Sequence, residues 1–239
     1  MPSFGAITIE ALHILESLSD DLTNNLDWGE AVYHAIESAY LDRKNQKSLL
    51  DAEKLTSKKW AEKRAAEIHN EQAFEDWDDL PESFTAPMGH TTHLTVVDKN
   101  GMVVSLTQTV GTIMGSKVVT PGLGFVYAQT LGWYLGEVKP GQRAASHISP
   151  IIVSKDGSPI LALGAAGGAK IPSAIVAVIS RVIDQNHSLD KAMALPRVYP
   201  QKEGIDLEWT GTDAWSKADS TYFINRSEER RVGKECRSR

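Results

Sequence analysis

The sequence predicts an α+β fold in which pairs of strands are layered against packed helices. Three observations predict it. Apolar side chains recur at mostly helical spacing in residues 1–43, and the residues after His90 change abruptly to two β-rich runs around an Asn-Gly pair. A glycine-rich stretch at residues 164–168 then leads into an apolar helix.

The N-terminal part predicts helices. Apolar residues follow a helical period over residues 7–18, and a polar break at residues 20–25 separates this stretch from a second helix expected over residues 27–43. Residues 44–72 are strongly charged with few apolar side chains, which predicts an exposed helix. Residues 75–89 are acidic and then contain proline and glycine, which predicts a flexible, exposed segment.

The residues after His90 predict a β-hairpin. Thr91–Val97 and Met102–Thr109 are expected to pair antiparallel, because Asn100-Gly101 between alternating apolar residues is a strong hairpin signal. Further elements are expected downstream. These are strands near 125–128, 151–154 and 160–164, a hairpin turn at 155–157, and helices over 172–185 and 189–194, the last stopped by Pro196.

Composition and charge exclude several classes of protein. The 239 residues carry a formal net charge of −6, which argues against a nucleic-acid binder, since such proteins normally present a basic face. No apolar run is long enough for a transmembrane helix, and residues 1–10 lack the pattern of a signal peptide. One cysteine, Cys236, rules out an internal disulfide.

The last residues differ from the rest in composition. Residues 226–239 carry six basic and three acidic residues and almost nothing apolar, and they resemble a sequencing adapter translated in frame. We therefore expect residues 226–239 to be an artefact outside the fold. The alternative is a natural basic tail.

Four motifs, in their order along the chain, resemble the γ-glutamyltranspeptidase family. They are Thr91–Gly101, Ser146–Pro150, Gly164–Lys170 and Leu195–Arg197. Upstream, "GAITIEALHILE" and "AVYHAIESAYLDR" resemble the last helices of that family's large subunit, so the resemblance runs from about Gly5 to Gln201.

The resemblance implies a fold and a domain division. The fold is the four-layer αββα sandwich of N-terminal-nucleophile (Ntn) hydrolases, represented in part. Residues 1–90 would be the end of the large subunit with a flexible pre-cleavage segment, and residues 91–225 a truncated small, catalytic subunit. A fragment broken at both ends is expected, which leaves a cytoplasmic, periplasmic or secreted location open.

The resemblance makes Thr91 the nucleophile, exposed by autocleavage between His90 and Thr91. An N-terminal threonine carries its own base, because the α-amino group has an unperturbed pKa near 8 and can take the proton from the hydroxyl. Thr109 would hydrogen-bond the nucleophile's oxygen. Strand alternation puts Thr91 and Thr95 on one face of their strand. The plainer interpretation is that these threonines are ordinary strand residues.

The backbone N–H groups of Gly167 and Gly168 would form the oxyanion hole, ahead of a helix whose dipole adds to the effect. The alternative is a plain glycine-rich turn. A phosphate-binding loop is disfavoured, because "GAAGGAKIP" lacks the Gly-Lys-Ser/Thr ending.

Substrate recognition departs from the family's pattern. The family's Ser-Ser pair is here Ser146-His147, its asparagine after the second threonine is Gly111, and no acid stands near Gly132 where the family has a carboxylate. Gln129 is retained from that stretch. We therefore expect Ser146, His147 and Gln129 to line the substrate site, with γ-glutamyl specificity open.

Two other interpretations compete with the enzyme: a metal site and an inactive binding subunit. His90 and His93 have H-x-x-H spacing, but on a strand they would point to opposite faces, so no metal site is expected. The resemblance implies no cofactor. The expected partners are a small γ-glutamyl-like or peptide amide and the chain's own second cleaved subunit. The alternative function is a catalytically inactive family member that acts as a binding or structural subunit.

Overall fold

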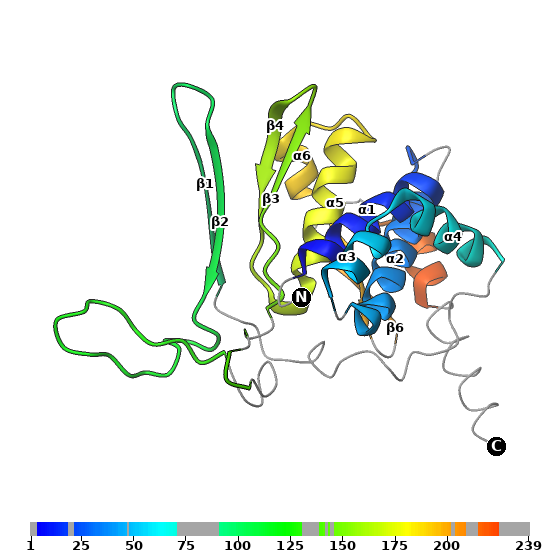
Figure 1. Ribbon diagram of the computed structural model, residues 1–239. Coiled ribbons are helices and arrows are strands. Elements are labelled where there is room, and N and C mark those ends of the chain that lie inside the picture. The colour runs from blue at the N-terminus through cyan, green and yellow to red at the C-terminus, as the bar shows by residue number, and fades with distance from the viewer. Residues whose placement is uncertain are drawn as a thin grey trace, which may run out of the picture. The chain divides into compact units, whose positions relative to one another are not determined.

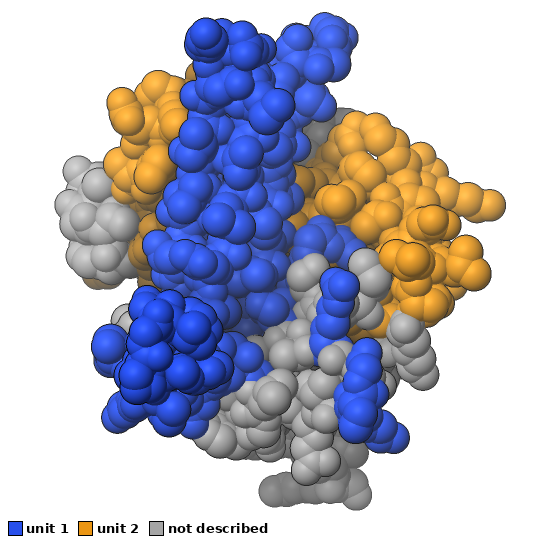
Figure 2. Space-filling view, turned by 60° about the vertical axis from the view of Figure 1, so that its left-hand side comes forward, with its two compact units in different colours: residues 1–6, 81–175 blue, residues 7–80, 176–239 orange. Residues whose placement is uncertain are grey.

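The computed structural model describes residues 4–18, 22–46, 48–70, 91–130, 139–141, 143, 146–201, 204–208 and 215–224. The chain divides into two compact units, coloured separately in Figure 2. Unit 1 comprises residues 1–6 and 81–175, and unit 2 comprises residues 7–80 and 176–239. His90, Gly132, the predicted flexible segment and the adapter-like tail lie outside the described residues. The two-subunit division at residues 90 and 91 stays a prediction.

Unit 2 is mainly helical, and α1 and α5 each begin in unit 1 and continue in unit 2. Side chains that accept hydrogen bonds from the first turn begin several helices: Asn24 accepts from Leu26 and Asp27, and Ser48 forms a capping box with Asp51. Its elements in chain order are α1 Gly5–Leu18, α2 Asn25–Asp42, η1 Arg43–Asn45, α3 Leu49–Leu55, α4 Lys58–His69, α5 Ile171–Ile183, α6 Leu189–Ala194, β5 Val198–Gln201 and β6 Gly204–Leu207.

The core of unit 2 is built around Trp28 on α2. Its indole N–H donates to the Ser180 hydroxyl at 3.1 Å, and the Arg181 guanidinium lies 4.0 Å from the ring centroid. Arg181 is itself buried and donates to the backbone carbonyls of Leu195 and Pro196 at 2.8 and 2.7 Å. One cation therefore ties α5 to the end of α6, through the Leu-Pro-Arg motif.

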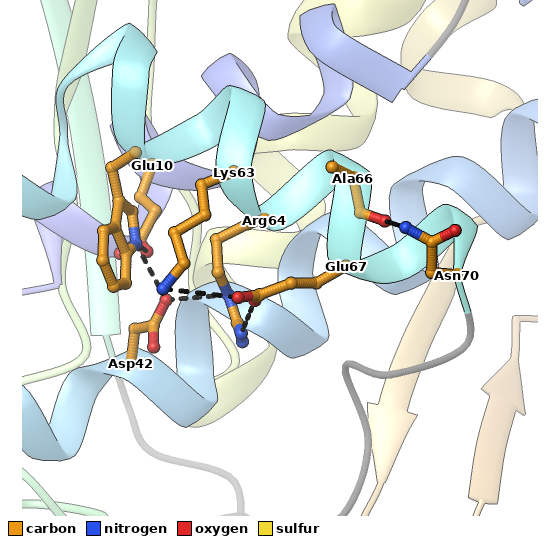
Figure 3. A network of polar contacts seen from close by, with 8 residues as sticks. Glu10, Asp42, Lys63, Arg64, Ala66, Glu67 and Asn70 are labelled. Carbon is orange, nitrogen blue, oxygen red and sulfur yellow. Dashed lines mark hydrogen bonds and ion pairs between the residues drawn. The ribbon is translucent and has the colours of Figure 1, made fainter.

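The prediction that residues 44–72 form an exposed helix is wrong for one face of α4. Ala61 and Ala65 are buried there, and the Trp60 indole N–H lies 3.0 Å from both Glu10 Oε1 and Asp42 Oδ2 (Figure 3). The buried positions of α4 are small alanines, and the docking contacts are polar. The spacing of large apolar side chains therefore gives no sign of this buried face.

Unit 1 contains two antiparallel hairpins. β1 (Thr91–Val97) pairs with β2 (Val103–Thr109), and β3 (Ile151–Lys155) pairs with β4 (Ser158–Leu163), as predicted (Figure 1). The first hairpin turns at Gly101, whose φ of 82° favours glycine, and the Asp98 carboxylate accepts from the N–H of Met102 at 2.8 Å. The β1–β2 hairpin is therefore confirmed in extent and register.

Two β features differ from the sequence prediction. The strand expected near residues 125–128 is only an isolated bridge between Val119 and Val126. The pair β5–β6 in unit 2 was not predicted, because each strand has only four residues and Pro200 lies inside one of them. The bidentate ion pair of Arg197 with Glu208, at 2.6 and 2.8 Å, closes this hairpin. In the part of the chain that the structure describes, no helix is long and apolar enough to cross a membrane.

Candidate active site

Thr91 and Thr109 form the last pair of the β1–β2 ladder, at its open end. Directly opposite residues in an antiparallel pair have Cβ atoms about 4.5–5.5 Å apart and point to the same face. Both threonines are half-buried. The hairpin thus brings the predicted nucleophile and its predicted hydrogen-bonding partner together, because the turn at residues 98–101 fixes the register as far as the open end of both strands.

The Thr109 hydroxyl is oriented by the residue that departs from the family's pattern. The backbone N–H of Gly111 donates to Thr109 Oγ1 at 3.1 Å. A hydroxyl has one proton and two acceptor lone pairs, so this bond is compatible with donation toward Thr91. Gly111 has a φ of 85°, and a side chain there would overlap the backbone carbonyl of Gln129. The backbone at residue 111 therefore requires glycine.

Gln129 is exposed and lies beside the end of β2. Its backbone N–H donates to the Val110 carbonyl at 2.8 Å, and its side-chain oxygen accepts from the Thr112 hydroxyl at 2.7 Å. The structure therefore brings Gln129 next to Val110, the residue that follows Thr109. Its side-chain amide oxygen already accepts a hydrogen bond from Thr112 on the neighbouring loop.

The second hairpin, β3–β4, lies against the face of β1–β2 that carries Thr91 and Thr109. The hydroxyl of Ser105 donates to the Leu163 carbonyl at 3.1 Å, and the Thr95 hydroxyl lies 3.5 Å from the Ala162 carbonyl. Ser105 and Thr95 are cross-strand partners, so one rung of β1–β2 contacts the end of β4. From there, the chain beyond Leu163 leads to Gly167 and Gly168.

Gly167 and Gly168 form a turn that only glycine adopts easily. Their φ angles are 130° and 61°, and the 3₁₀ turn Gly168–Lys170 leads directly into α5 at Ile171. Successive backbone N–H groups ahead of a 13-residue helix provide a site where negative charge is stabilised. The geometry of the turn fits the predicted oxyanion hole, and that role stays a prediction.

Ser146 and His147 lie elsewhere in unit 1, beside the start of the chain. The Ser146 hydroxyl accepts from the backbone N–H of Ile148 at 3.3 Å. The His147 ring is buried and packs edge-on against the ring of Phe4, with centroids 4.5 Å apart. The backbone N–H of Phe4 also bonds to the Ile148 carbonyl at 3.4 Å. The substrate-binding role predicted for this pair stays untested.

Sequence reasoning considered His93 only as half of a metal motif and missed its setting. The ring nitrogens of His93 lie 2.8 Å from Thr107 Oγ1 and 3.0 Å from Thr95 Oγ1, on the face that carries Thr91. Burial lowers the pKa of His93, which favours the neutral ring. Among the described residues, no group of three or more His, Cys, Asp or Glu side chains is placed to hold a metal ion.

The site can support nucleophilic acyl chemistry if Thr91 becomes an N-terminus. The hairpin offers a threonine hydroxyl with a second hydroxyl directly opposite, and unit 1 also contains a glycine turn at the N-terminus of a helix. These are the parts that a tetrahedral intermediate requires: a nucleophile, a hydrogen-bond donor to it and donors for the oxyanion.

Comparison with known proteins identifies relatives of this chain. Residues 1–218 match the family described as Gamma-glutamyltranspeptidase. An "Acylase ACY 1 proenzyme" from Pseudomonas sp. (strain V22) is 35% identical over 65% of this chain, and a "Glutathione hydrolase proenzyme" from Pseudomonas sp. (strain A14) is 30% identical over 84% of it. The chain spans only 28% and 39% of the lengths of these relatives.

A solved structure confirms the predicted fold class. The cephalosporin acylase from Bacillus halodurans covers 94% of this chain with a TM-score of 0.72, and the chain covers 42% of that protein. At 20% identity this likeness speaks for the fold alone. The match over residues 1–218, together with the paired threonines and the glycine turn, shows that the chain belongs to the γ-glutamyltranspeptidase family.

Proposed function

We propose that this chain carries the catalytic threonine of a self-cleaving acyl transferase or hydrolase that acts on γ-glutamyl or related amides. The observation that supports the proposal is the pairing of Thr91 with Thr109 at the open end of β1–β2. The glycine turn at Gly167–Gly168 and membership of the family support it further.

Maturation would begin with the precursor's own peptide bond. The Thr91 hydroxyl oxygen attacks the His90 carbonyl carbon, and the C–N bond breaks, so that the acyl group moves from nitrogen to oxygen. The hydroxyl proton ends on the new α-amino group. Water then hydrolyses the ester, which leaves a carboxylate on His90 and a free hydroxyl on Thr91.

The mature site would use the same oxygen on a substrate amide. The neutral α-amino group of Thr91 takes the hydroxyl proton, Oγ1 forms an ester with the acyl group, and the leaving amine receives the proton. Thr109 would donate to the nucleophile's oxygen, and Gly167 and Gly168 would donate backbone N–H bonds to the oxyanion. Water or an acceptor amine then releases the acyl group.

The intact mass of the full-length protein tests the proposal, beside Thr91→Ala and Thr91→Ser. We expect two chains that separate between His90 and Thr91 in the wild type, a single chain in Thr91→Ala, and cleavage in Thr91→Ser because a hydroxyl is retained. A single uncleaved chain in all three proteins contradicts the proposal and favours the inactive binding subunit.

A second candidate function, an acylase of amides without the γ-glutamyl α-amino group, is favoured by the surroundings of Gly111. A side chain at this position would overlap the Gln129 carbonyl, so the asparagine that the family uses here has no space. The family's Ser-Ser pair is also changed here, to Ser146-His147.

Three p-nitroanilides separate the two candidates: γ-glutamyl, glutaryl, which lacks only the α-ammonium, and butyryl, which lacks the ammonium and the carboxylate. A γ-glutamyltransferase prefers the first by a large factor, because a site built for a charged group leaves it unpaired when the group is absent. An acylase hydrolyses glutaryl- or butyryl-p-nitroanilide at least as fast as γ-glutamyl-p-nitroanilide. Loss of all three activities in Thr91→Ala assigns them to this site.

A further inference from the structure

The His93 side chain lies between the two hairpins of unit 1. It is on the same face of β1 as Thr91, and its cross-strand partner Thr107 is the only buried residue of the described β2 strand. Nδ1 lies 2.8 Å from Thr107 Oγ1, and Nε2 lies 3.0 Å from Thr95 Oγ1. Both ring nitrogens therefore have a hydroxyl partner on the β1–β2 hairpin.

Gly164, the first residue after β4, faces the His93 ring from the second hairpin. A side-chain methyl built on Gly164 would overlap three atoms of the His93 ring, namely Nδ1, Cε1 and Cγ. The backbone of Gly164 is outside the positive-φ region, so other residues could adopt it. Glycine is required there by the imidazole ring, which occupies the volume that a Cβ atom would take.

The hydrogen bonds around the ring form a directed chain. Burial lowers the pKa of His93, so the neutral ring has one donor and one acceptor nitrogen. Thr95 Oγ1 lies 3.5 Å from the Ala162 carbonyl and can donate to it while it accepts from Nε2–H. Nδ1 then accepts the proton of the Thr107 hydroxyl. The chain links β1 and β2 to the last residues of β4.

His93 and Gly164 are both close in sequence to predicted site residues. Thr91 is two residues before His93 on the same strand face, and Gly167 is three residues after Gly164. The contacts of Thr95 with Ala162 and of His93 with Gly164 advance together toward the open end of β1–β2. Thr91 and the Gly167–Gly168 turn therefore each lie two to four residues along the chain from the contact between His93 and Gly164.

We propose that His93 is a positioning residue, whose ring seated on Gly164 sets the spacing between the nucleophile strand and the Gly167–Gly168 turn. The proposal rests on the proposed function, since it concerns the reaction of Thr91. Displacing reacting groups by about 1 Å costs up to about a hundredfold in rate. A residue that fixes this spacing therefore affects the rate of chemistry more than it affects substrate binding.

The test is a double-mutant cycle in the full-length protein: His93→Ala, Gly164→Ala and the double variant, with Leu94→Ala as a control on the opposite face of β1. The readouts are the rate of cleavage between His90 and Thr91 by intact mass, and kcat and KM on the best p-nitroanilide. Thermal unfolding of each protein is recorded, so that loss of fold is separated from loss of rate.

We expect each single variant to lower the cleavage rate and kcat at least tenfold with KM changed less than threefold. The double variant should be faster than Gly164→Ala, because the new methyl occupies space that the ring has vacated. Leu94→Ala should cleave at nearly the wild-type rate.

Wild-type rates in His93→Ala, or losses that multiply in the double variant, overturn the positioning role alone. The positioning role is also overturned if the rates of the three variants fall only in proportion to the amount of folded protein, because the contact is then merely structural. A wild type that never cleaves before Thr91 overturns the proposed function and this proposal with it. The two failures are therefore distinguishable.

Discussion

The helix α2 and the strand β1 differ sharply in how much of their side chains they bury. Every residue of α2 from Val32 to Tyr40 is buried, and Trp28, Tyr33 and Ile36 are fully enclosed. No residue of β1 is buried, and its apolar side chains Leu94 and Val96 are 42% and 52% exposed. Among the described residues, the buried apolar side chains are therefore concentrated in unit 2, whereas the predicted nucleophile Thr91 lies in unit 1.

This difference predicts that stability and activity respond to different substitutions. Full burial of a large apolar side chain contributes about 1.5–3 kcal/mol, so α2 should dominate the unfolding free energy. The hydroxyls of the Thr91–Thr109 pair contribute little packing, but they have to be held in one register. Substitutions on α2 should change stability, and substitutions at the ladder's open end should change rate.

The largest effect is expected for Trp28→Ala. The variant removes a fully buried indole, its hydrogen bond to Ser180 and the surface under the Arg181 guanidinium, so we expect a loss of about 3–5 kcal/mol in unfolding free energy. Urea unfolding followed by circular dichroism measures it. Trp28→Phe, which keeps a ring, should lose about half as much; a loss below about 1 kcal/mol in Trp28→Ala would contradict the comparison.

Thr109→Val should have the next largest effect, and on rate alone. The variant keeps the β-branched shape that strands favour and removes the hydroxyl that accepts from Gly111, so we expect kcat to fall about a hundredfold. Thr109→Ser is the matched control and should retain most activity. The unfolding free energy of Thr109→Val should stay within about 1 kcal/mol of the wild type. A large loss of stability would place the hydroxyl's main role in folding.

The pH dependence of unit 2 provides a third test, at Glu10. Burial and the neighbouring Asp42 raise the pKa of Glu10 from 4.5 to about 10, while the Trp60 N–H and Arg64 act in the opposite direction (Figure 3). The folded protein thus keeps a proton that the unfolded chain releases above pH 4.5. The stabilising effect of that proton is complete below pH 4.5 and is lost as pH rises toward 10.

Glu10→Gln keeps a neutral amide that can accept from Trp60 and donate to Asp42, and it does not titrate. Between pH 5 and pH 9 we therefore expect the wild type to lose on the order of 2 kcal/mol more unfolding free energy than Glu10→Gln. Urea midpoints at the two pH values measure the difference. An equal change in unfolding free energy between the two pH values in both proteins would show that Glu10 is ionised in the folded state.

Local signals explain how much of the fold the sequence predicted. The β1–β2 hairpin was predicted with its register because the turn residues and both strands are contiguous, and the Thr91–Thr109 pair follows from that register. The helix after Gly168 was predicted because glycine, proline and an apolar run stand together. The α4 face was missed because Ala61, Ala65 and a polar network bury it.

The setting of His93 was not predictable from the sequence for a different reason. Its partner Gly164 is on another hairpin, and the register between two hairpins is set by contacts that no turn encodes. Gly164 is also a glycine without a backbone need for glycine, so turn chemistry gives no signal there. Only the positions of the ring atoms show why this residue is small.

The smallest effect is expected for Leu94→Ser, the opposite of Trp28→Ala in this comparison. Leu94 lies on the face of β1 away from His93 and is 42% exposed, so we expect a loss below about 1 kcal/mol in the unfolding free energy of this chain. The urea midpoint measures it, and Val104→Ser, 47% exposed on β2, is a second position of the same kind. A loss approaching that of Trp28→Ala would mean that this face is packed in solution, and that unit 1 draws its stability from a contact outside the described residues.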